Sequence, residues 1–215
     1  MSAAIWPVPS ANERAPGRLM KGRWDGGWLR RARRCPSPNF NERPAGTAVR
    51  LALIHSISLP PGQYGGDGVE RLFTNRLDWD AHPYFQTIRG LEVSAHFLVR
   101  RDGELVQFVS CDARAWHAGA SVWHDQPGCN DYSIGIELEG LEGETFDAPQ
   151  YEVLVGLVSD LRTRYPIEGA VGHEHVAAGR KRDPGPGFDW ARFGARLGWI
   201  EDPAGGGLMP RSAAL

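Results

Sequence analysis

Three side chains could together bind a metal ion: His55, His173 and Asp183. His55 lies near the end of the apolar run 51–57, where a buried polar ring needs a partner. Asp183 lies in the proline- and glycine-rich stretch 181–187, a stiff loop that can fix a carboxylate. Two neutral imidazoles and a carboxylate, with one position left for water, are typical of a catalytic zinc site, which lowers the pKa of the water to about 7. The residues alone also allow a separate structural role for each, and both interpretations stay open.

Two further charged residues could act beside such an ion. Glu137 lies deep in an alternating segment, where a carboxylate needs a partner or a raised pKa, and a raised pKa suits a general acid or base. Glu139 we interpret as part of a solvated sheet face. Lys181 lies two residues before Asp183, so an extended loop would place both side chains on one side, and the lysine could stabilise an oxyanion. The alternative for Lys181 is simple exposure in the basic run 180–182.

An aromatic residue in the segment 114–119 could contact a substrate. Trp116 lies among small residues and could stack on a sugar or cap a cleft. The alternative is that Trp116 serves only to pack against other side chains, because the chain contains eight tryptophans. Arg114 is a nearby cationic candidate.

Secondary-structure patterns place these residues on a mixed sheet. Strands are predicted over 51–57, 94–101, 104–109, 133–140 and 169–172, and helices over 68–77, 147–164 and 189–197. Asp102-Gly103 predicts a two-residue hairpin between the second and third strands. Strands and helices alternate without a strict βαβ order, so the predicted fold class is α/β, a mixed β-sheet flanked by helices.

The length and composition indicate one globular domain. The chain has 215 residues, with 41% hydrophobic and 23% charged. We expect a flexible N-terminal extension over 1–21, one domain over 22–201, and a flexible tail over 202–215. The net charge of −2 gives no electrostatic reason to expect nucleic acid as a partner. No apolar run reaches the roughly 20 residues needed to span a bilayer, so we expect no membrane partner. We also expect a monomer.

The cysteine pattern favours a reducing compartment. The three cysteines, Cys35, Cys111 and Cys129, have no CxxC spacing, which argues against a disulfide framework and against a thiolate zinc site. The N-terminal residues lack the apolar core of a secretory signal. We therefore expect a cytoplasmic protein.

Seven segments together resemble one family, the zinc N-acetylmuramoyl-L-alanine amidases of amidase type 2. In chain order they are ARRCPSPNFNERP, HSISLPPGQYGG, VSAHFLVRRDGELVQFV, RAWHAG, CNDYSIGIELEG, GH at 172–173 and RKRDPGPGFDW. With their flanks they extend from about Trp28 to Trp199, and their order and spacing together are specific. The resemblance implies the amidase type 2 fold, which peptidoglycan-recognition proteins share.

The resemblance implies roles for individual residues. It assigns His55, His173 and Asp183 as zinc ligands, Glu137 as the catalytic glutamate and Lys181 as the catalytic lysine.

Substrate-binding residues are implied near this set. Trp116 matches an aromatic residue that lines the muramyl side of the cleft, and we add Arg114 and His117 as candidates. Ser56 occupies a position where relatives often have asparagine. Some relatives have arginines where this sequence has Glu92 and Gly128, and a glutamate there would repel a substrate carboxylate.

The implied activity is zinc-dependent hydrolysis of the amide bond between (1,6-anhydro)N-acetylmuramic acid and L-alanine in muropeptides, as part of bacterial cell-wall recycling. One alternative is a murein lysin that acts on intact peptidoglycan. Another is a non-catalytic peptidoglycan-binding protein of the same fold, which would be expected to lack a zinc ligand.

Overall fold

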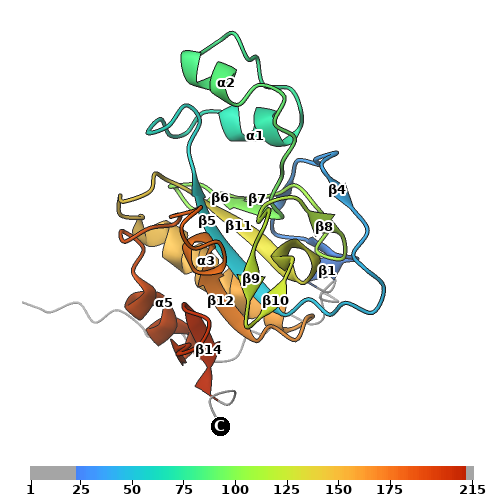
Figure 1. The fold of residues 1–215 in the computed structure, drawn as a ribbon, viewed down its shortest axis with the longest axis vertical. Coiled ribbons are helices and arrows are strands. Elements are labelled where there is room, and N and C mark those ends of the chain that lie inside the picture. The colour runs from blue at the N-terminus through green and yellow to red at the C-terminus, as the bar shows by residue number, and fades with distance from the viewer. Residues whose placement is uncertain (1–22, 212–215) are drawn as a thin grey trace, which may run out of the picture.

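The computed structural model of the chain describes residues 23–211 and has a mixed eight-stranded sheet at its centre (Figure 1). The strand order is β13-β14-β12-β5-β11-β6-β7-β3. Their bounds in chain order are β3 (Arg33–Arg34), β5 (Leu51–Ile57), β6 (Phe97–Val99), β7 (Leu105–Gln107), β11 (Ser133–Glu139), β12 (Gly169–Gly172), β13 (Trp199–Glu201) and β14 (Leu208–Pro210). The α/β prediction of a mixed sheet with flanking helices is confirmed.

The four central strands are parallel. β5 pairs with β12 on one side and with β11 on the other, and β11 pairs with β6. The carboxyl ends of these strands therefore meet at one edge of the sheet, which is where open α/β sheets place their ligands. The smaller elements are β1 (Trp24–Asp25), β2 (Trp28–Leu29), β4 (Phe40–Asn41), β8 (Arg114–Ala115), β9 (Val122–Trp123), β10 (Gln126–Pro127) and the 3₁₀ helix η1 (Cys129–Asp131).

One face of the sheet is covered by helix α3 (Ala148–Arg162), which also contacts α5 (Trp190–Leu197). The apolar stripe of α3 is buried in one cluster with Ile54 of β5 and with Ile134 and Ile136 of β11. The backbone N–H of Asp147 donates to Oε1 of Gln150 at 3.0 Å, which satisfies a free amide at the helix start. Because strand side chains alternate, the other face carries His55 of β5 and Glu137 of β11.

That other face is apolar at one end and polar at the other. Leu51 and Leu53 of β5 pack with Trp123 and Tyr132 from the segment that crosses the sheet. His55 follows on the same side of β5, nearer the carboxyl end. The apolar end anchors the covering segment and leaves the polar end for a site.

Two short helices, α1 (Gly68–Phe73) and α2 (Pro83–Thr87), lie beyond the carboxyl edge of β5, at the top of Figure 1. Leu72 and Phe73 of α1 join a second apolar cluster with Leu98 of β6. Helix α1 is shorter than the predicted 68–77 because Asn75 takes a left-handed conformation, with φ 56°, which ends the helix.

The turn between β6 and β7 differs from the predicted two-residue hairpin. The N–H of Arg100 donates to the carbonyl of Glu104 at 2.9 Å, and the N–H of Gly103 donates back to Arg100 at 2.9 Å. Three residues therefore form the loop, and Gly103 takes the left-handed position with φ 90°. A tight turn followed by a left-handed glycine is the common way to close a three-residue hairpin.

Residues 202–211, which we expected to belong to a flexible C-terminal tail (202–215), form part of the fold. β14 inserts between β13 and β12, and its Leu208 is buried in the main core. The carboxylate of Asp202 contacts Nε2 of His124 at 2.7 Å. The predicted N-terminal extension, 1–21, lies outside the described residues. Among the described helices, none is both long enough and apolar enough to cross a membrane.

Candidate active site

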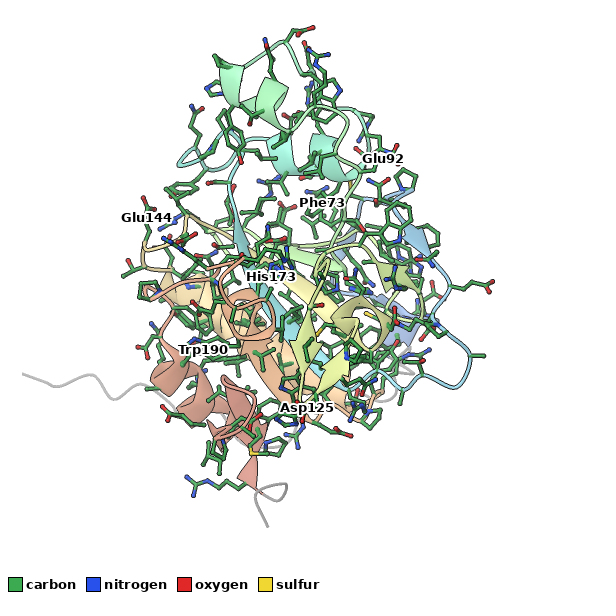
Figure 2. The ribbon with its side chains drawn as sticks, viewed as in Figure 1. Phe73, Glu92, Asp125, Glu144, His173 and Trp190 are labelled. Carbon is green, nitrogen blue, oxygen red and sulfur yellow. The ribbon has the colours of Figure 1, made fainter. Side chains whose placement is uncertain are left out.

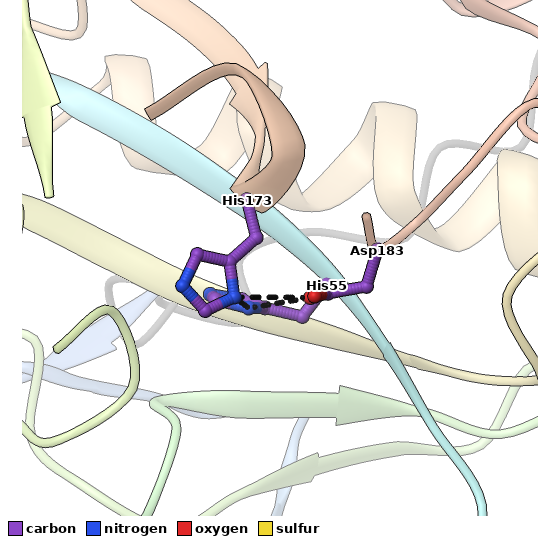
Figure 3. A group of neighbouring side chains, drawn as sticks. All are labelled: His55, His173 and Asp183. Carbon is purple, nitrogen blue, oxygen red and sulfur yellow. Dashed lines mark hydrogen bonds and ion pairs between the residues drawn. The ribbon is translucent and has the colours of Figure 1, made fainter. Parts of the chain in front are cut away.

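Three predicted metal ligands converge at the carboxyl edge of the sheet (Figure 3). Nδ1 of His55 and Nδ1 of His173 lie 3.0 Å apart. Each of these nitrogens lies 3.1 Å from Oδ2 of Asp183. The three side chains come from β5, from the start of α4 (His173–Val176) and from the loop that follows α4. Residues separated by up to 128 positions therefore present donor atoms to one point.

The backbone explains this convergence. Gly172 is the register partner of Ile54 on parallel strands, so His173 follows beside His55. The N–H of Glu174 donates to the backbone carbonyl of Asp183 at 2.9 Å, which ties the loop to α4. A Cβ on Gly172 would lie 2.9 Å from Cδ of Pro184, so only glycine lets this loop approach the strand end.

The donor set fits a zinc ion. Four ligands around a tetrahedral zinc lie about 3.3 Å from one another, given Zn–N and Zn–O distances of about 2.0–2.1 Å, and the three donor atoms here are already close to that spacing. Burial lowers the pKa of His55 to about 4, so its imidazole is neutral near pH 7. Burial opposes ionisation of Asp183, but the contacts with His173 and His55 outweigh it and lower its pKa below the usual range. Neutral imidazole and ionised carboxylate are the forms that bind zinc.

Glu137 lies beside the first of these ligands. It is the register partner of His55 on β11, and its side chain lines the same cleft. Its Oε2 is buried and has no hydrogen-bond partner among the described residues. Burial, reinforced by the charge of Asp183, raises the pKa of Glu137 well above its usual value, while the nearby Lys181 lowers it. A buried carboxyl group with a free oxygen is suited to accept and return a proton.

A cleft of about 610 Å³ opens over these residues. Figure 2 shows His173 at the centre of the molecule, between the sheet and the α1–α2 segment. Lys181 is exposed and lines the cleft next to Asp183. The cleft is also lined by apolar side chains of the segment that contains α1 and α2 and of the loop after α2, among them Ile88 and Leu91. The cleft can therefore accept a ligand with both polar and apolar parts.

Two substrate-binding candidates lie where contact is possible. Trp116 lines the cleft, and its Nε1–H donates to Oδ1 of Asn41 at 2.8 Å, which holds the indole in place. Ser56 also lines the cleft, and its buried hydroxyl oxygen has no partner within the part of the chain that the structure describes.

Arg114 and His117, the other two substrate-binding candidates, both have partners within the protein. Nε of Arg114 donates to Oδ1 of Asp131 at 2.5 Å, and Arg114 does not line the cleft. His117 does line the cleft, but Nδ1 lies 3.0 Å from Nε2 of His55 and Nε2 lies 3.5 Å from the hydroxyl of Ser133. Both ring nitrogens are used within the protein, so His117 has no polar ring atom left for a substrate.

Glu139 is not part of a solvated face. It is 4% exposed, and its carboxylate accepts from the backbone N–H groups of Gly65 and Arg101 at 2.7 and 3.1 Å. Arg100 contacts the same carboxylate at 3.3 Å. Alternation along β11 alone could not show whether the side chain of Glu139 faces water or a covering loop. Glu92 is exposed near the edge of the molecule (Figure 2).

Comparison with known proteins decides the family. A sequence model described as N-acetylmuramoyl-L-alanine amidase matches residues 45–186, the part of the chain that contains every candidate site residue. The chain belongs to the N-acetylmuramoyl-L-alanine amidase family. The family resemblance noted in the sequence is confirmed, and the chain is an amidase, an enzyme that hydrolyses an amide bond.

Individual relatives support the same assignment. The amidase is 51% identical over 173 residues to the 1,6-anhydro-N-acetylmuramyl-L-alanine amidase AmpD of Citrobacter freundii, covering 80% of this chain and 92% of the relative. A crystal structure of a selenomethionine AmpD derivative matches with a TM-score of 0.77 and 50% identity, over 80% of this chain and 98% of that one. The amidase AmiD of Escherichia coli, solved with anhydro-N-acetylmuramic acid-L-Ala-D-γ-Glu-L-Lys, matches with a TM-score of 0.51 and 27% identity, over 74% of this chain and 65% of that one.

Proposed function

We propose that this amidase hydrolyses the bond between the lactyl carbonyl of (1,6-anhydro)N-acetylmuramic acid and L-alanine in soluble muropeptides of cell-wall recycling. His55, His173 and Asp183 hold a zinc ion in this proposal. The AmpD names of relatives near 50% identity support the substrate class. The amidase acts as a cytoplasmic monomer, and its macromolecular partners include neither nucleic acid nor membrane.

One observation carries the proposal. Two histidine nitrogens and one aspartate oxygen lie 3.0–3.1 Å apart inside the cleft, beside a buried carboxyl group. Few structural roles need two imidazoles and a carboxylate pointed at one another, whereas a catalytic zinc site needs this set.

Glu137 moves the proton in this reaction. When bound, zinc polarises a carbonyl oxygen and makes a water molecule more acidic. Oε2 of Glu137 takes a proton from the attacking water and delivers it to the alanine nitrogen as the C–N bond breaks. The oxygen of the water remains on the lactyl carbon, so the products are a muramic acid carboxylate and a free stem peptide.

Three cleft residues stabilise the transition state or bind the substrate. The ammonium group of Lys181 stabilises the negative oxygen of the tetrahedral intermediate. Trp116 offers an aromatic face on the sugar side, held by its bond to Asn41. The hydroxyl of Ser56, which has no hydrogen-bond partner among the described residues, forms a hydrogen bond with the substrate.

The experiment compares two substrates by mass spectrometry of the products. Purified amidase is incubated with anhydromuramyl tripeptide and, in parallel, with intact sacculi, and bound zinc is measured on the same sample. We expect one zinc per chain and release of the tripeptide from the soluble substrate only.

Two other outcomes would identify the alternative functions. Efficient digestion of sacculi would identify a murein lysin instead. Tight binding of the soluble substrate without cleavage would identify a binding protein. Glu137→Gln serves as the control, because it should keep the zinc and lose the cleavage.

A further inference from the structure

We infer that His117 is a positioning residue that fixes the tautomer of the ligand His55, and that the pair His117–Ala118 orients both histidine ligands. This inference rests on the proposed zinc site. It concerns the second nitrogen of each imidazole, the atom that does not face Asp183.

Both second nitrogens contact neighbouring residues of one segment. Nε2 of His173 lies 3.0 Å from the backbone carbonyl of Ala118. A carbonyl oxygen only accepts, so Nε2 of His173 carries the hydrogen and Nδ1 presents its lone pair toward Asp183. Nε2 of His55 lies 3.0 Å from Nδ1 of His117. One residue and its neighbour therefore contact both ligands.

The direction of the second contact follows from a chain of hydrogen bonds. The hydroxyl of Ser133 donates its only hydrogen to the carbonyl of Cys129 at 2.5 Å. Its oxygen must then accept from Nε2–H of His117, which lies 3.5 Å away. Nδ1 of His117 is left with a lone pair, which accepts from Nε2–H of His55. The lone pair of His55 is thereby fixed on Nδ1, the atom that faces the other donors.

The segment itself is held from two sides. Oδ1 of Asn130 accepts from the backbone N–H groups of His117 and Ala118, at 3.1 and 2.8 Å. The guanidinium of Arg180 donates to the carbonyls of Ala118 and Ala120, at 2.6 Å each. These bonds fix the position of the groups that orient the ligands.

A glycine on β11 makes room for the His117 ring. A Cβ on Gly135 would lie 2.5 Å from Cγ and 2.6 Å from Nδ1 of His117, closer than carbon atoms can pack. Glycine weakens a strand interior, so its presence indicates a close approach at that point. The ring meets His55 edge-on, with centroids 5.1 Å apart.

The test measures zinc affinity by competition with a chelator, which does not depend on turnover. Loss of partners that orient a metal ligand costs about 10–100-fold in affinity. We expect His117→Leu to weaken zinc binding by that amount, because a leucine cannot accept from His55. The variant His117→Gln restores an acceptor oxygen and should recover most of the affinity. Gly135→Ala, which displaces the ring, should act in the direction of His117→Leu.

The matched control is His96→Leu. His96 is a buried imidazole whose ring centroid lies 5.7 Å from that of His117, and its hydrogen bonds within the described residues do not include His55. Its loss should lower thermal stability and leave zinc affinity within about twofold. An equal loss of zinc affinity in the control and in His117→Leu would overturn the inference, as would equal losses in His117→Leu and His117→Gln.

A spectroscopic readout tests the tautomer directly. Long-range ¹H–¹⁵N NMR of the zinc-loaded amidase should show His55, His117 and His173 each protonated at Nε2. A hydrogen on Nδ1 of His117 would overturn the inference while leaving the zinc site intact. A wild-type amidase that binds no zinc would overturn the proposed function instead, so the two failures are distinct.

Discussion

Glu137 and His55 are register partners on the adjacent parallel strands β11 and β5. Partners on neighbouring strands extend their side chains from the same face, about 5 Å apart. The buried carboxyl group and the first proposed zinc ligand are therefore held together by the backbone of the sheet. Neither position depends on a flexible loop, so the distance between them is fixed by the fold.

Replacement of Glu137 by glutamine should remove proton transfer without removing the metal. We expect kcat for the anhydromuramyl tripeptide to fall by about 10²–10⁴-fold, the usual contribution of a general acid or base. Zinc content should stay at the wild-type level, because Glu137 is not one of the three convergent donors. A variant with wild-type kcat would show that another group moves the proton.

The same substitution should stabilise the metal-free protein near neutral pH. Burial and Asp183 raise the pKa of Glu137 in the folded state, whereas the unfolded chain has the ordinary value of about 4.3. Wild-type stability is therefore full below that pH and falls as pH rises toward the folded-state pKa. Glutamine does not titrate, so the variant should be more stable at pH 7 by about 0.5–2 kcal/mol.

Urea unfolding at two pH values measures this difference. The free energies of unfolding of the two proteins should converge near pH 4 and separate at pH 7, with zinc removed from both. Equal separation at the two pH values would mean that the gain comes from packing and not from ionisation.

Lys181 should act on the rate and not on the metal. Replacement by methionine keeps the length of the side chain and removes the charge that faces the cleft. We expect kcat to fall by about 10²–10³-fold, as when an oxyanion donor is lost. Zinc affinity and thermal stability should be unchanged because the side chain is exposed. If only KM rises, Lys181 binds the substrate and does not stabilise the transition state.

Glu139 should be a stability residue. Its buried carboxylate accepts from two backbone N–H groups and contacts Arg100, so Glu139→Ala removes the acceptor of both N–H groups and one carboxylate partner of the buried Arg100. We expect a loss of about 3 kcal/mol in urea unfolding. Glu104 provides the control, because it also contacts Arg100 but is 38% exposed, and its replacement by alanine should cost less than about 1 kcal/mol. Similar losses in the two variants would refute a special role for Glu139.

Local patterns predicted most of the fold that positions the site. The apolar run that ends at His55 and the alternation that contains Glu137 each specify a strand, and both strands are present. The strand that ends at Gly172 was also predicted, because a short apolar run before a glycine can be recognised from the local sequence alone. Their pairing into one sheet follows from nonlocal contacts, which spacing alone does not determine.

The residues around the ligands were harder to predict. The sequence suggested His117 as a substrate-binding candidate, but nothing local shows that its ring contacts His55. A signal did exist in Gly135, a glycine inside a strand, which indicates a close approach. The strand β14 was missed because its short run follows three glycines that are typical of a tail.

The central claim is that one zinc ion, held by His55, His173 and Asp183, drives amide hydrolysis. The most direct test measures zinc by elemental analysis, and turnover of the anhydromuramyl tripeptide, in wild type and in Asp183→Ala. We predict one zinc per chain and full activity in the wild type, and neither in the variant. Wild-type turnover by an Asp183→Ala protein that contains no zinc would contradict the account.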